Sequence, residues 1–134
     1  MDIFFQDPTA IPLPPDEVRI KELRAEPWFD NRRVRIYMEV TPFQKRPNGE
    51  IIIRNPAGVE VAHASIIEAI SPRMEITLHM RGALQAGNYI ASATIYYVKK
   101  SEAEEEQAEN YADPERRVVV DTGLVEFTLP VSLD

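Results

Sequence analysis

The 134-residue chain contains no cysteine, which excludes disulfide bonds, thiolate metal sites and thiol nucleophiles. It has only two histidines, His63 and His79, and no His-x-x-x-His spacing joins either of them to a second histidine. No run of about 18 apolar residues occurs, so no transmembrane helix is predicted. We therefore expect no metal site and no insertion into a membrane.

Sequence motifs of catalysis are also missing. The chain has no Gly-x-Ser-x-Gly elbow, no phosphate-binding glycine loop and no dinucleotide fingerprint. Its 22 acidic residues offer many carboxylate pairs for hydrolysis, but none of these pairs is marked by its surroundings. We predict a protein that is not an enzyme, with no catalytic residues and no cofactor. A hydrolase is the most distant alternative.

The first eight residues contain neither a basic region nor an apolar stretch of the kind that secretory leaders have. We therefore expect a cytoplasmic protein. A piece excised from an exported protein is the alternative that the sequence leaves open.

The net charge of −7 is concentrated in one segment. Residues 101–115 hold seven acids and no base, and the rest of the chain has 15 acids against 15 bases. Because no broad basic face remains, we expect no nucleic-acid partner. Within this acidic loop, Glu104, Glu105 and Glu106 are candidates for contact with a partner. A solvated loop is the alternative, and the Asp-x-Asp-x-Asp-Gly periodicity of a calcium loop is missing.

The N-terminal segment is rich in proline. Four prolines among residues 2–16 predict an extended arm and not a helix, because proline fixes φ and lacks an N–H. Ile3, Phe4 and Phe5 make this arm too apolar for a free tail. It either packs on its own domain, which we favour, or docks on another subunit. We predict two parts, an arm at 1–16 and a folded domain at 17–134.

Alternating apolar residues predict β-strands in the folded domain. The alternation is cleanest over residues 33–40 and 74–81, whereas residues 62–70 fit either a strand or a helix. The segment Gly87-Asn88-Tyr89 begins the longest predicted strand, which runs to Val98.

Breaks in this pattern predict the remaining features. Leu23 is out of phase with its neighbours, which indicates a bulge or a strand that changes sheets. Asp121-Thr122-Gly123 predicts another bulge or kink. Residues 26–31 read as a loop, and Pro47-Asn48-Gly49 predicts a turn that closes a second loop at 41–49. A capping-box pattern at Ser101 predicts a short helix inside the acidic loop.

These features predict an all-β fold, an immunoglobulin-like antiparallel β-sandwich of about seven or eight strands. The segment Ile53-Arg54-Asn55-Pro56-Ala57-Gly58-Val59-Glu60-Val61, followed by a strand and then by Gly87-Asn88-Tyr89, resembles the immunoglobulin-like and fibronectin-III-like sandwich domains of bacterial proteins. It is also similar to the macroglobulin type of sandwich domain. The resemblance implies a binding, spacer or assembly module without catalysis. The Cys-Trp-Cys set of antibody domains is missing, which excludes membership of that type.

Two predicted loops carry candidate partner-binding residues. Trp28 and Phe29 are either an exposed aromatic anchor or a plug that closes one end of the sandwich. Phe43, in the second loop, has the same two interpretations, and Lys45 and Arg46 follow it. In an immunoglobulin-like strand order this second loop lies at the same end as the acidic loop. Its two bases then pair with the glutamates of the same chain or present a bipolar surface to another chain.

We therefore predict a module for protein–protein contact or self-association. The alternative is a carbohydrate- or ligand-binding sandwich that uses exposed aromatic rings as a flat platform. Trp28, Tyr37 and Tyr96 are its candidate residues, because both tyrosines fall on the outward phase of their strands. Cross-strand aromatic pairing on a solvated face would explain the same two positions.

Overall fold

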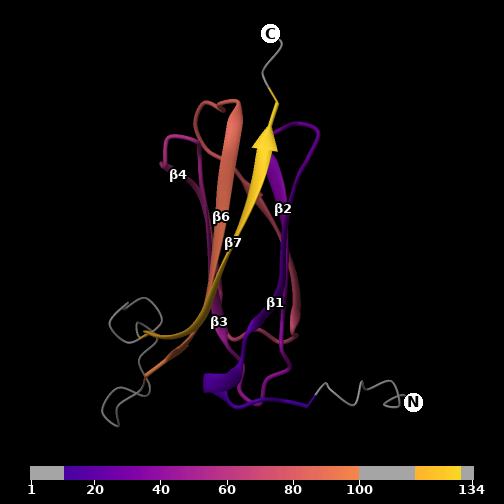
Figure 1. Ribbon diagram of the computed structural model, residues 1–134, viewed down its shortest axis with the longest axis vertical. Coiled ribbons are helices and arrows are strands. Elements are labelled where there is room, and N and C mark those ends of the chain that lie inside the picture. Colours follow the sequence, from indigo (N-terminus) through magenta and orange to yellow (C-terminus); the bar gives the residue numbers. More distant parts are fainter. Residues whose placement is uncertain (1–10, 100–116, 131–134) are drawn as a thin grey trace, which may run out of the picture.

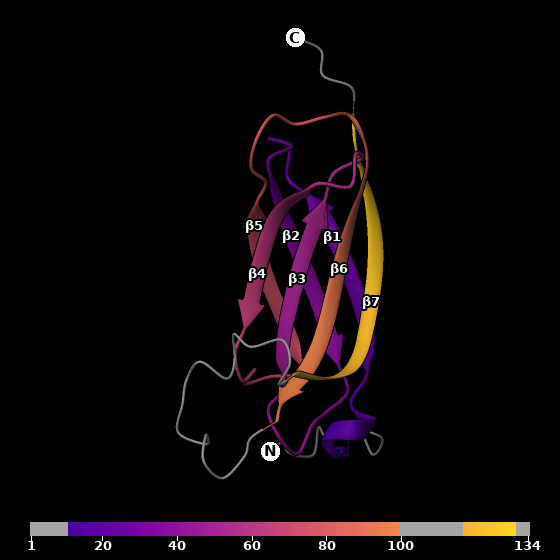
Figure 2. The same ribbon diagram turned by 90° about the vertical axis from the view of Figure 1, so that its left-hand side faces the viewer.

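The computed structural model describes residues 11–99 and 117–130 (Figure 1). In this part of the chain, seven antiparallel strands form two sheets, one of three strands in the order β1-β2-β5 and one of four in the order β4-β3-β6-β7. Figure 2 shows the four-stranded sheet lying across the face of the other. The predicted all-β sandwich is therefore confirmed. The strands are β1 (Ile20–Pro27), β2 (Arg33–Val40), β3 (Asn48–Arg54), β4 (Glu60–Ile66), β5 (Arg73–His79), β6 (Gly87–Val98) and β7 (Arg117–Leu129).

The loops gather at two ends of the sandwich, because neighbouring strands run in opposite directions. The β1–β2, β3–β4 and β5–β6 connections lie at the end that is uppermost in Figure 1, which we call the upper end. The β2–β3 and β4–β5 connections lie at the opposite, lower end. The acidic loop with its predicted helix falls outside the described residues.

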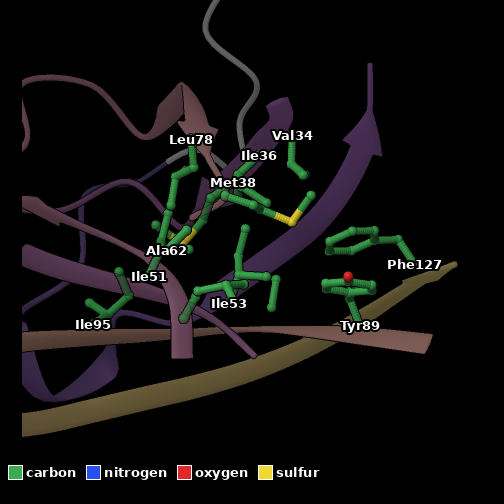
Figure 3. Packing of buried hydrophobic residues seen from close by; sticks show 14 of the residues in the cluster. Val34, Ile36, Met38, Ile51, Ile53, Ala62, Leu78, Tyr89, Ile95 and Phe127 are labelled. Carbon is green, nitrogen blue, oxygen red and sulfur yellow. The ribbon is translucent and has the colours of Figure 1, made fainter. Parts of the chain in front are cut away.

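The core lies between the two sheets and follows the predicted alternation (Figure 3). In β2, four side chains point inward and are buried, while Arg33, Arg35 and Tyr37 point outward. In β6 the inward face carries Tyr89, whose ring stacks on that of Phe127 with 5.3 Å between the centroids. The buried residues of β2 are Val34, Ile36, Met38 and Val40.

The start of β6 is built around a tyrosine corner. The hydroxyl of Tyr89 donates a hydrogen bond to the carbonyl oxygen of Gln85 at 2.8 Å and accepts one from the Gln85 amide at 3.0 Å. Immunoglobulin-type sandwiches use this arrangement at the corner before a central strand. Gly87 adopts a φ of 130°, which a residue with a side chain rarely takes, and an added Cβ would lie 3.0 Å from Cγ of Pro56. The Gly-Asn-Tyr sequence thus marks the strand for two structural reasons.

Parts of two predicted loops are strand residues. Pro27 is the last residue of β1, so the connection to β2 is shorter than predicted. Asn48 and Gly49 begin β3, and the predicted turn at these residues is wrong. The Asn48 side chain is buried because its amide oxygen accepts a hydrogen bond from the Glu68 amide at 2.8 Å. A turn-forming residue thus joins the start of β3 to the β4–β5 connection at the lower end.

The ambiguous stretch at 62–70 continues β4 to Ile66 and then leaves the sheet, so its ordered part is a strand. The predicted bulge near Leu23 is confirmed by a register shift between Ile20 and Glu22. In β7, Asp121 pairs with Ile95 while Val119 pairs with Tyr96. The extra residue in that strand is Val120, one position before the segment in which the bulge was predicted.

The described part of the arm packs on its own domain. The amide of Leu13 donates a hydrogen bond to the Pro42 carbonyl at 3.0 Å, and the Gln44 amide donates to the Leu13 carbonyl at 2.9 Å. The Leu13 side chain packs against the core. A single 3-10 turn, η2 (Pro15–Glu17), follows before β1. At these residues the arm contacts its own domain and is not extended throughout.

Candidate binding surface at the β1–β2 hairpin

The loop at the tip of the β1–β2 hairpin is held by backbone hydrogen bonds. The Trp28 amide donates to the Arg33 carbonyl at 2.8 Å, and the Asn31 amide donates to the Trp28 carbonyl at 2.9 Å. Asn31 has a φ of 56°, a left-handed conformation that asparagine tolerates better than most residues. The Phe-Asp-Asn sequence therefore closes a tight loop between the two strands.

Asp30 fixes the returning side of this loop. Its Oδ1 accepts hydrogen bonds from the Arg32 and Arg33 amides at 3.0 and 3.1 Å, and its Oδ2 accepts one from Nε of Arg33 at 2.8 Å. The hydrogen bonds from the Arg32 amide, then from the Arg33 amide and side chain, lower the pKa of Asp30 from 3.8 to about 2. The carboxylate is therefore ionised at neutral pH and keeps the Arg33 side chain in place.

Arg33 in turn covers Trp28. Its guanidinium carbon lies 4.0 Å from the centre of the indole ring, which is the geometry of a cation–π contact. Arg32 ties the loop to the neighbouring connection, because its guanidinium donates to the Met80 carbonyl at 2.8 Å. These contacts join Trp28, Asp30, Arg32 and Arg33 in one ordered frame at the upper end.

Phe29 projects from this frame into solvent. Its side chain is 90% exposed, the highest value among the large apolar residues that the structure describes. Beside it lies a surface recess of about 280 Å³ lined by Glu26, Pro27, Trp28 and Arg35. An ordered loop that exposes an aromatic ring loses little conformational entropy on binding. Phe29 thus has the properties of an aromatic anchor, and Trp28 is a wall of the recess.

The candidates of the β2–β3 loop lie at the lower end and have other contacts. Phe43 is half-buried, packs against the core and forms a parallel bridge with Leu13, as expected of a plug. The Lys45 carbonyl accepts a hydrogen bond from the Tyr97 hydroxyl at 2.8 Å, which places this loop beside the end of β6. Arg46 is exposed. The candidates Glu104, Glu105 and Glu106 lie outside the described residues.

The predicted aromatic platform does not form. Tyr96 is 1% exposed, so its predicted exposure is wrong. It also lies on the four-stranded sheet, whereas Tyr37 lies on the three-stranded sheet. An arginine covers each ring. The guanidinium carbon of Arg24 lies 4.4 Å from the centre of the Tyr37 ring, and that of Arg117 lies 4.3 Å from the centre of the Tyr96 ring. The arginines occupy the faces on which a ligand would stack.

The structure brings together a polar cluster that the sequence analysis missed. Oε1 of Glu50 accepts a hydrogen bond from Arg117 at 2.7 Å, and its Oε2 lies 2.6 Å from Nε2 of His63. Partial burial acts to raise the pKa of Glu50, but the hydrogen bonds with Arg117 and His63 outweigh it and the pKa is lowered. Burial also raises the pKa of Tyr96, which lies beneath Arg117. These residues come from four strands, β3, β4, β6 and β7, and their spacing in the sequence carries no signal of the contact.

Within residues 11–99 and 117–130, no group of three or more histidine, aspartate or glutamate side chains is placed to hold a metal ion. The same residues include no helix of the length and hydropathy needed to cross a membrane.

No family model and no curated protein matches the chain. Solved structures do match it, at low identity. A β-glucuronidase from Bifidobacterium dentium is similar with a TM-score of 0.47 and 14% identity, over 84% of this chain and 18% of that one. A β-glucuronidase from Ruminococcus gnavus gives 0.46 and 13%, over 84% and 16%. Chitinase ChiW from a Paenibacillus species gives 0.42 and 14%, over 83% and 8%. The chain therefore spans less than a fifth of each of these proteins.

Proposed function

We propose that this chain is an immunoglobulin-like or fibronectin-III-like module without catalytic activity, and that it contacts another protein through the tip of the β1–β2 hairpin. The division into three and four strands and the tyrosine corner at Tyr89 support the immunoglobulin-like assignment.

A single observation carries the binding proposal, namely the exposed ring of Phe29 on an ordered loop. Exposed aromatic side chains are frequent among the few residues that dominate the energy of a protein interface. The frame made by Asp30, Arg33 and Trp28 supports the proposal further, because it holds Phe29 in place before a partner arrives. A loop that merely plugged the sandwich would bury this ring.

Site-specific photocrosslinking tests the proposal. Phe29 is replaced by p-benzoylphenylalanine in the full chain, which is produced in its natural cell and irradiated. We expect one discrete protein adduct. The control carries the same crosslinker at Leu124, which is 72% exposed on the outer face of the four-stranded sheet. Equal crosslinking from both positions, or none from position 29, would contradict the proposal.

A second variant separates binding from folding. Phe29→Ser should leave the free energy of unfolding within about 0.5 kcal/mol of the wild type, because the ring makes little contact with the rest of the chain. The same substitution should remove the adduct from a crosslinker placed at Ala83, an exposed position in the adjoining β5–β6 connection that Arg32 ties to the hairpin.

A further inference from the structure

The β1–β2 hairpin carries both a projecting ring and a recess. Phe29 stands out from the tip, and its sequence neighbour Trp28 lines a recess of about 280 Å³ together with Glu26, Pro27 and Arg35. The recess is open to solvent, so a phenyl ring from outside the chain can reach its walls. Pro27 and Trp28 offer it apolar walls.

We infer that the partner of this hairpin is a second copy of the chain, with Phe29 of each copy seated in the recess of the other. This inference rests on the proposed function. A two-fold axis between two hairpins forms both contacts at once. In such an isologous interface, Phe29 of the first copy contacts the recess of the second, and Phe29 of the second contacts the recess of the first. A surface that presents ring and recess side by side is complementary to itself under that operation.

Charge complementarity supports the same arrangement. Glu26 and Arg35 face each other across the β1–β2 ladder and both line the recess. Within one chain, Nη1 of Arg35 lies 3.9 Å from Oε2 of Glu75, a long ion pair on an exposed surface that contributes little to stability in water. In the two-fold pair, Glu26 of each copy lies against Arg35 of the other, so the rim of the interface carries two opposite-charge pairs.

The contact is small, and its strength follows from its size. Two hairpin tips bury less surface than the roughly 1,200 Å² at which stable interfaces begin, so the dimer belongs to the weak class. We expect a dissociation constant between about 1 μM and 1 mM. The chain is therefore monomeric when dilute and dimeric at high concentration or when the copies are tethered.

Sedimentation equilibrium of the full chain from about 10 μM to 2 mM tests the inference over the expected range. The wild type should shift from monomer to dimer. Phe29→Ser should raise the dissociation constant about 30-fold or more, the effect of losing a central aromatic anchor. Ile70→Ser is the matched control, since this side chain is 81% exposed at the lower end and should leave the constant unchanged.

Charge reversal gives a sharper test, because the inferred pairing is reciprocal. Glu26→Arg alone and Arg35→Glu alone should each weaken self-association about tenfold or more through like-charge contacts. An equimolar mixture of these two variants should regain the wild-type constant, since both inter-chain pairs are then opposite in sign. Arg54→Glu reverses an exposed charge at the same end, outside the recess, and should change nothing.

Failure of the inference differs from failure of the proposed function. A wild type that stays monomeric at about 2 mM, or a mixture of charge variants that stays monomeric, overturns the two-fold dimer. If the crosslinker at position 29 then yields an adduct whose added mass is not that of this chain, the hairpin binds a different protein and only the inference falls. If it yields no adduct, both fall.

Discussion

The hydroxyl of Tyr89 provides a measurable test of the corner that begins β6. In Tyr89→Phe the ring keeps its stack on Phe127, and the two hydrogen bonds to Gln85 are lost. A hydrogen bond of this kind contributes about 0.5–1.5 kcal/mol net. Gln85 is exposed, so water can replace the hydroxyl at its amide and carbonyl groups, which favours the lower half of the range for each bond. We expect the free energy of unfolding to fall by about 1–2 kcal/mol.

Urea denaturation measures this loss, followed by circular dichroism and by the fluorescence of Trp28, the only tryptophan in the chain. The midpoint should fall while the slope m stays constant, because the folded surface does not change. The melting temperature of a domain of this length should fall by about 4–8 °C for the same loss.

Tyr37→Phe is the matched control. The Tyr37 hydroxyl lies 3.5 Å from Oε1 of Glu39, at the limit of hydrogen-bond distance, so its removal should cost less than about 0.5 kcal/mol. Equal midpoints for the two variants would refute the claim that the Tyr89 hydrogen bonds stabilise the corner.

Three further predictions follow from single residues. Gly87→Ala should cost about 1–3 kcal/mol in urea unfolding, because an alanine at φ 130° is strained and its Cβ would lie 3.0 Å from Pro56. Glu50→Gln should cost about 1–2 kcal/mol by removing the anion that Arg117 binds, and high salt should reduce the difference. Asp30 titrates at about 2, below its unfolded value of 3.8. The stabilisation of the hairpin by the ionised carboxylate is therefore complete above pH 3.8 and is lost as the pH falls through about 2. Carbon chemical shifts of this carboxyl should follow that window, and a midpoint near 3.8 would contradict the prediction.

The strands were predictable where one face of each is buried. In β2 and β5 the apolar side chains recur every second residue, because successive residues of a strand point to opposite faces. The start of β6 was predictable from Gly87 and Tyr89, although the hydrogen bonds that explain the pair became visible only in the structure.

The errors fall on residues whose role depends on distant partners. Asn48 belongs to a residue type that favours turns, but the Glu68 amide, 20 positions away, gives its side chain a buried hydrogen bond and keeps it in β3. The cluster around Glu50 depends on Arg117, 67 positions away. Neither contact leaves a local pattern in the sequence, so periodicity and turn propensity could not reveal them.

The aromatic residues of the surface show why exposure could not be predicted from strand phase. Trp28, Tyr37 and Tyr96 all lie under an arginine side chain. A ligand that stacks on such a ring must first displace the guanidinium, and it loses the cation–π contact that the displaced group made. Phe29 has no such cover among the described residues, so a partner gains the full burial of its ring. Under the proposed function, recognition at the upper end begins at Phe29 beside the recess that Trp28 lines, and the rings of Tyr37 and Tyr96 serve the stability of their own sheets.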